Sequence, residues 1–125
     1  MEKSEGGIRR DLKERTFEFA VRVTKLCRVL KPADLASRVI AGQLLRAGTS
    51  IGANYEEAQA SHSRADFACK CGIALKEARE AHYWLRLLAA TDTVPQPRLT
   101  DIITECSELI AVLTTIVKKV KQPAD

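Results

Sequence analysis

The residue types that most often carry catalysis or bind metals are scarce in this sequence and poorly spaced. A di-metal site in a helical bundle needs two Glu-x-x-His motifs and further carboxylates. Neither His62 nor His82 follows a glutamate by three residues. Cys69 and Cys71 would point about 200° apart on a helix, so they cannot share a metal ion. The other cysteines are Cys27 and Cys106. We therefore predict no catalytic residue, metal, cofactor or small-molecule substrate, and no enzyme activity.

Basic side chains are the second group of residues that could carry a function. The chain has 20 Lys and Arg against 16 Asp and Glu, a net charge of +4. The surplus lies near the N-terminus, with a lysine cluster near the C-terminus, and it permits contact with nucleic-acid phosphates. The alternative is a solvated surface that keeps the protein soluble. The candidate nucleic-acid contacts are Arg9, Arg10, Lys13, Arg15, Arg22, Lys25, Arg28, Lys118, Lys119 and Lys121.

A third group is polar and lies in two central segments. It could form hydrogen bonds between neighbouring helices and fix their register, for example by pairing Asn54 or Glu57 with Lys70. The alternative is a solvated helix surface with local partners. The members of this expected polar network are Ser50, Asn54, Glu57, Lys70, Glu77 and Glu80.

Four helices are predicted to position these groups. Apolar residues recur with helical periodicity, Lys31-Pro32, Ser61–Ser63 and 91–97 interrupt the pattern, and no segment requires a strand. Asp34 and Ser63 are candidate N-terminal caps. We expect an all-α, antiparallel up-down-up-down four-helix bundle over residues 11–121, preceded by a flexible segment, 1–10, and followed by a tail, 122–125. The predicted helices span 11–31, 34–60, 64–90 and 98–121.

The second predicted helix keeps glycines in its interior, where each costs about 1 kcal/mol relative to alanine. Gly48 and Gly52 are four residues apart and share one face of the stretch LLRAGTSIGANYEEAQA, residues 44–60. Small residues at this spacing let a neighbouring helix approach closely. We expect an aromatic side chain to fill the space, from Phe17, Phe19, Tyr83 or Trp84.

Phe17 and Val21 lie on the side of the first predicted helix that faces away from its core stripe. They indicate a second contact surface, an oligomer interface. Scattered surface apolar residues are the alternative. The chain has one domain's length and neither a membrane span nor a signal peptide, so we expect a cytoplasmic protein.

The central region resembles the bacterial four-helix bundle proteins, also called the 23S ribosomal RNA intervening-sequence proteins. The matching runs are SIGANYEEAQASHSRADF, Ser50–Phe67, and IALKEAREAHYWLRLL, Ile73–Leu88. The resemblance implies an antiparallel four-helix bundle that assembles into homo-oligomeric rings, often pentamers. It also implies a distant similarity to the accessory protein of diversity-generating retroelements, which assists a reverse transcriptase and binds nucleic acid. The family has no established catalytic residue.

Two hypotheses for the function follow. The first is a non-enzymatic homo-oligomeric module that binds structured RNA, or a nucleic-acid enzyme such as a reverse transcriptase, through basic surfaces. The second is a structural or protein-interaction subunit with no nucleic-acid role. Binding to RNA at low salt distinguishes them.

Overall fold

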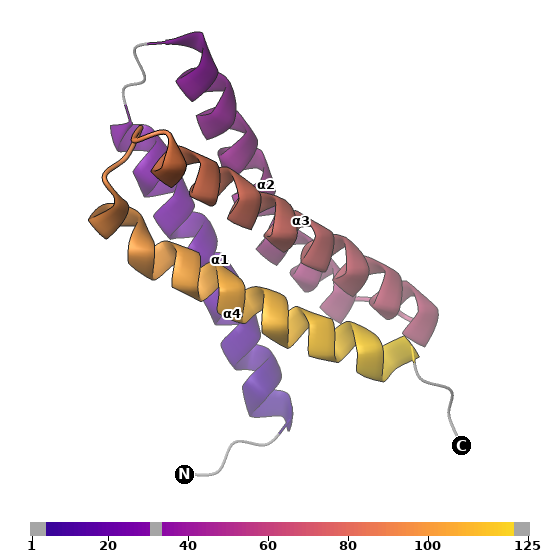
Figure 1. Ribbon diagram of the computed structural model, residues 1–125. Helices are drawn as coiled ribbons and strands as arrows, with labels where there is room; N and C mark the ends of the chain where they lie inside the picture. Colours follow the sequence, from indigo (N-terminus) through magenta and orange to yellow (C-terminus); the bar gives the residue numbers. More distant parts are fainter. Residues whose placement is uncertain (1–4, 31–33, 122–125) are drawn as a thin grey trace.

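The described part of the chain forms four helices in antiparallel order (Figure 1). The computed structural model describes the backbone of residues 5–30 and 34–121, and the side chains from residue 11 onward within those ranges. The helices are α1 (Glu5–Val29), α2 (Leu35–Gln59), α3 (Arg64–Ala90) and α4 (Gln96–Lys121). No strand occurs within the described ranges. The prediction of an all-α four-helix bundle is confirmed.

The helix boundaries differ from the predicted ones mainly at the N-terminus. α1 begins at Glu5 instead of residue 11, so much of the segment expected to be flexible is helical. Residues 1–4, Lys31 and the tail 122–125 lie outside the described residues. α4 begins at Gln96, which places Pro97 in the first turn, where its missing N–H breaks no helical hydrogen bond.

Both predicted caps are present. The Asp34 carboxylate accepts a hydrogen bond of 2.8 Å from the Ser37 backbone N–H at the start of α2. The Ser63 hydroxyl accepts one of 3.0 Å from the Asp66 N–H at the start of α3. Each satisfies a backbone donor that the first turn of a helix leaves without a partner.

The core is formed by one stripe from each helix, as their apolar periodicity requires. It is rich in alanine on α3 and in leucine on α4, and Tyr55 and Phe19 are its largest fully buried side chains. Each helix packs against its neighbour in sequence, whereas α1 meets α4 over a short stretch only. In Figure 1, α1 crosses behind α4 and diverges from it. The last turns of α4 are accordingly only half-buried, at Ile116, Val117 and Val120.

Candidate functional site

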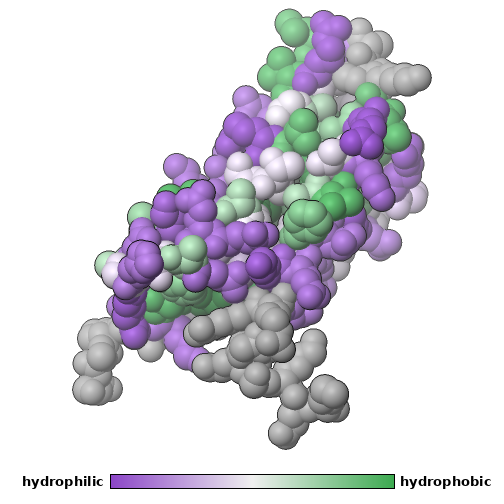
Figure 2. Space-filling view, turned by 180° about the vertical axis from the view of Figure 1, so that it is seen from behind, coloured by the Kyte–Doolittle hydropathy of each residue, from purple (hydrophilic) through white to green (hydrophobic). Residues whose placement is uncertain are grey.

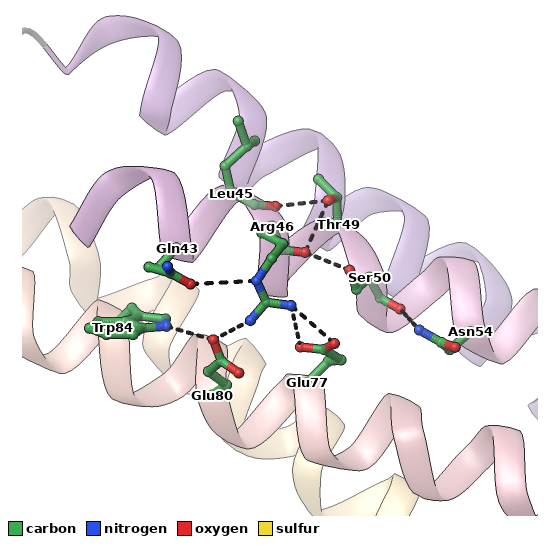
Figure 3. Close-up of polar contacts among 9 residues, drawn as sticks. All are labelled: Gln43, Leu45, Arg46, Thr49, Ser50, Asn54, Glu77, Glu80 and Trp84. Atoms are coloured by element: carbon green, nitrogen blue, oxygen red, sulfur yellow. Dashed lines mark hydrogen bonds and ion pairs between the residues drawn. The ribbon is translucent and has the colours of Figure 1, made fainter. Parts of the chain in front are cut away.

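An ion-pair network joins α2 to α3 around Arg46 (Figure 3). The Arg46 Nη1 donates to both carboxylate oxygens of Glu77, each at 3.2 Å, and its Nη2 donates to Glu80. The Trp84 indole N–H donates to the same Glu80 oxygen at 3.0 Å. Two carboxylates one helical turn apart on α3 therefore hold one guanidinium from α2, which fixes the register of this hairpin.

The network controls the ionisation of Glu80. The hydrogen bond from Trp84, and then that from Arg46, hold the pKa of Glu80 below its usual value. The charge of Lys76, four residues away, acts in the same direction. The hydrogen bond to Glu80 also raises the pKa of Arg46. Glu80 is thus an ionised carboxylate that accepts two hydrogen bonds. Its lowered pKa does not suit a general acid.

The expected polar network forms in part. Lys70 Nζ lies 3.2 Å from Glu57 Oε1 across the hairpin, as predicted, and this contact raises the pKa of Lys70. Asn54 and Ser50 do not reach α3. The Asn54 amide donates to the Ser50 carbonyl at 2.8 Å, and the Ser50 hydroxyl donates to the Arg46 carbonyl at 2.6 Å, so both bond along α2.

Arg46 was missing from the predicted network, although the sequence contained a signal for it. Residues that face each other in an antiparallel hairpin have numbers with a nearly constant sum. The pair Glu57–Lys70 sets that sum at 127, which places Arg46 opposite Ala81, next to Glu80 and about one turn from Glu77. Counting outward from the turn would have identified the arginine.

The glycines of α2 allow close packing, but the aromatic partner predicted for them is wrong. A Cβ on Gly48 would lie 2.9 Å from both Cγ atoms of Val23, and one on Gly52 would lie 3.2–3.3 Å from Thr16. β-Branched side chains of α1 occupy the space. Of the four expected aromatics, Phe17 and Tyr83 are exposed, Trp84 joins the Arg46 network, and Phe19 is buried in the core.

The predicted basic contacts divide into Arg15, which is ion-paired, and side chains that lie on the surface. Arg15 Nε and Nη2 donate to Glu105 at 3.0 and 2.8 Å, and Nη2 also donates to Glu108 at 2.9 Å. These bonds, led by the one to Glu105, raise the pKa of Arg15. Arg15 is therefore a link between α1 and α4, and its charge is neutralised within the protein.

The other predicted cations lie on the surface. Arg22 is half-buried, and the side chains of Arg9 and Arg10 lie outside the described part. Beside the C-terminal lysines, Arg64 Nε donates to the Val120 carbonyl at 2.9 Å and adds a further cation, one that the sequence analysis did not include. The exposed members of the predicted set are Lys13, Lys25, Arg28, Lys118, Lys119 and Lys121.

Two apolar side chains one helical turn apart on α1, Phe17 and Val21, form an apolar strip. Phe17 is 60% exposed, Val21 is half-buried, and Leu45 of α2 is 38% exposed. Figure 2, seen from the side on which α1 lies, shows neutral and hydrophobic residues in a patch bordered by hydrophilic ones. Beside Phe17 a shallow depression is lined by Lys13, Glu14, Glu18 and Glu56. The surroundings of Phe17 are therefore acidic.

Cys71, Cys106 and His82 are placed for packing, whereas Cys69 and His62 are exposed. Burial raises the pKa of Cys71 to about 11, and burial followed by the charge of Glu105 raises that of Cys106 to about 12, so both thiols stay protonated near neutral pH. The His82 ring lies 3.1 Å from the Ser107 hydroxyl, and burial and then Arg86 lower its pKa. Within the described ranges no three His, Cys, Asp or Glu residues are grouped to hold a metal.

Fold and surface together define a class of protein: a small helical bundle with an interhelical ion-pair network, protonated buried thiols and charged outer faces. No described helix is long and apolar enough to cross a membrane. The family model described as 23S rRNA-intervening sequence protein matches residues 10–115. The chain belongs to that family.

A solved structure supports this assignment. It is the crystal structure of a protein of unknown function from the S23 ribosomal protein family of Bacteroides thetaiotaomicron VPI-5482. The two chains share 41% sequence identity with a TM-score of 0.79, and the match covers 86% of this chain and 98% of the other. No curated protein matches the sequence.

Proposed function

We propose that the protein is a non-enzymatic, homo-oligomeric module that binds RNA, or a nucleic-acid enzyme such as a reverse transcriptase, through the basic surfaces of α1 and α4. The observation that carries the proposal is the distribution of ion pairs. The five pairs described above use Glu57, Glu77, Glu80, Glu105 and Glu108 but only three cations. The rest of the chain therefore carries more positive charge than the formal +4.

That excess charge is accessible to a partner. Lys25, Arg28, Lys118 and Lys121 are exposed and make no ion pair with any described residue. Such cations attract nucleic-acid phosphates whatever the base sequence, and the binding affinity falls steeply as the salt concentration rises. The family's name refers to an rRNA gene insert, and it agrees with RNA as the partner without identifying one.

Filter binding to a structured RNA at about 50 and about 200 mM salt tests the proposal. The wild type should bind at the lower concentration and weaken at the higher. The paired variants Lys25→Ala/Arg28→Ala and Lys118→Ala/Lys121→Ala should each bind less tightly with a shallower salt dependence. Arg38→Ala, an exposed cation outside these surfaces, is the control. If the wild type does not bind RNA at low salt, the nucleic-acid role is wrong.

The second candidate is a structural or protein-interaction subunit, which the apolar strip of Phe17 and Val21 favours. Near Phe17 the strip has three acids, Glu14, Glu18 and Glu56, against one cation, Lys13, whereas the cations Lys25 and Arg28 lie further along α1. A second copy shifted along the strip would bring opposite charges together, which supports homo-oligomerisation, with a pentamer as the family resemblance implies.

Light-scattering mass in solution tests the oligomer. Val21→Glu places a charge in the strip and should lower the mass toward that of the monomer, because an unpaired charge in an apolar interface is costly. Thr115→Glu, on an exposed part of α4, should leave the mass unchanged. A wild-type monomer, or a Val21→Glu variant with wild-type mass, contradicts the assignment of this interface.

A further inference from the structure

A stripe of cations and one aromatic residue on α3 is used by none of the contacts described above. Lys76, Arg79, Tyr83 and Arg86 are all exposed and follow one another at helical spacings of three and four residues, so they share one face of α3. The helix rise places Lys76 and Arg86 about 15 Å apart along the axis. We call these four residues the α3 stripe.

The three cations have no partner in the described part of the chain. Lys76, Arg79 and Arg86 make no ion pair or hydrogen bond through their side chains there. The nearby acids Glu77 and Glu80 are occupied by Arg46 on the side facing α2. Positive charge on the stripe is therefore offset only in part by the acids of its own helix, through the interaction of Lys76 with Glu80.

Tyr83 is held in place yet open to a ligand. Its ring meets that of Trp84 edge to face, with centroids 5.1 Å apart and planes at 77°. Trp84 is itself fixed by the hydrogen bond to Glu80, which Arg46 orients in turn (Figure 3). Even so, Tyr83 is 53% exposed. An anchored aromatic between cations is the arrangement that stacks on an unpaired base while the cations hold phosphates.

The neighbouring edge of α4 suits the same ligand. Ser107 lies against His82 of α3, which places it beside the stripe's helix. Thr104 and Thr100, three and seven residues earlier, share its face of α4 and are exposed. These hydroxyls add hydrogen-bonding groups without negative charge.

We propose that the α3 stripe binds single-stranded nucleic acid, with Tyr83 stacking on a base and Lys76, Arg79 and Arg86 contacting phosphates. The inference rests on the proposed function in assuming a nucleic-acid partner, but it assigns binding to a face separate from α1 and the end of α4. It also separates two kinds of contact: cations alone on those surfaces, and cations with a stacking ring here.

The test uses the intact protein and an oligouridylate of about 12 nucleotides, with oligothymidylate as the DNA arm. Trp84 is the only tryptophan in the chain and touches Tyr83, so its fluorescence reports on the stripe directly. We expect binding to change Trp84 emission. Tyr83→Ala should weaken binding about tenfold and Tyr83→Phe should retain it, because a phenyl ring stacks equally well.

A charge-matched pair of variants separates this inference from the proposed function. Lys76→Ala/Arg79→Ala/Arg86→Ala should lower the salt slope of oligouridylate binding by about 2, and by more than Lys25→Ala/Arg28→Ala/Lys118→Ala, which removes the same number of charges but keeps the stripe. The reverse result overturns the inference and leaves the proposed function standing. A wild type that binds neither this probe nor structured RNA overturns both.

Two further outcomes bear on the kind of ligand. Competition by polyglutamate as strong as that by oligouridylate would mean that the stripe recognises acidic protein segments, and would overturn the stacking role. Tighter binding of the RNA arm than the DNA arm would support a contact with the 2′-hydroxyl. Circular dichroism melting of each variant confirms that the bundle is intact.

Discussion

At the scale of single residues, the glycines of α2 show how a helix can be locally unfavourable and still be required. Gly48 faces Val23, whose two Cγ atoms leave no room for a methyl group, whereas Gly42 has nothing within 4 Å of its absent Cβ. The same residue type therefore has opposite roles two turns apart on one helix. Gly48 permits the approach of α1, and Gly42 only weakens α2.

We predict that Gly48→Ala lowers the free energy of unfolding by about 1–3 kcal/mol, because both Val23 methyl groups must move and overpacking outweighs the gain in helix propensity. Gly42→Ala should raise it by up to about 1 kcal/mol. Urea unfolding followed by circular dichroism measures both. A stabilising Gly48→Ala would contradict the close contact between α1 and α2.

At the scale of helices, the Arg46 network ties α2 to α3 through groups that titrate. The pKa of Glu80 is lower in the folded protein than in the unfolded chain. The unfolded state therefore takes up the proton first as the pH falls. The stabilisation from Glu80 is complete above its unfolded pKa, about 4.3, and is lost as the pH falls through the lower folded value.

We predict that Glu80→Gln, which mimics the protonated side chain, destabilises the protein by up to about 1 kcal/mol at neutral pH, because the ion pair is partly exposed. The difference from the wild type should shrink as the pH approaches 3. Urea unfolding at several pH values measures it. Glu56→Gln, at an exposed acid that forms no ion pair with any described residue, is the control. A difference that does not vary with pH would contradict the role of the ionised carboxylate.

At the scale of the whole molecule, the bundle is closed unevenly. α2 and α3 each pack against two neighbouring helices. α1 packs along α2 and contacts α4 only over a short stretch, where Arg15 binds Glu105 and Glu108. The angle between α1 and α4 in Figure 1 shows the same asymmetry. Local opening should therefore begin at the outer helices, α1 and α4, before α2 and α3.

We predict that Arg15→Ala lowers the free energy of unfolding by about 1 kcal/mol, as expected for a partly exposed pair with several hydrogen bonds. It should speed hydrogen exchange at α1 amides more than at α3 amides. Native-state hydrogen exchange resolves the two helices. Arg98→Ala, at an exposed arginine that pairs with no described residue, should change neither. Equal acceleration in all helices would mean that α1 does not open separately.

The sequence by itself determined the helices, their order and the buried stripes. Helical periodicity and caps such as Asp34 and Ser63 act within a few residues of the chain, so they can be read without a fold. It also predicted that the α2 glycines admit a neighbour and that Asn54 or Glu57 pairs with Lys70, because an antiparallel hairpin fixes which segments are opposite each other.

Only the tertiary structure decided which side chains pack against Gly48 and Gly52. It also decided which charged side chains form ion pairs. Val23 and Thr16, instead of an aromatic residue, contact the glycines. The reason is that the rotation of α1 about its own axis determines which of its side chains face α2. The charge of Arg15 is paired with Glu105 and Glu108 because α1 and α4 cross at its position. Ion pairs form within a few ångströms, and helix crossings set distances on that scale while local sequence does not.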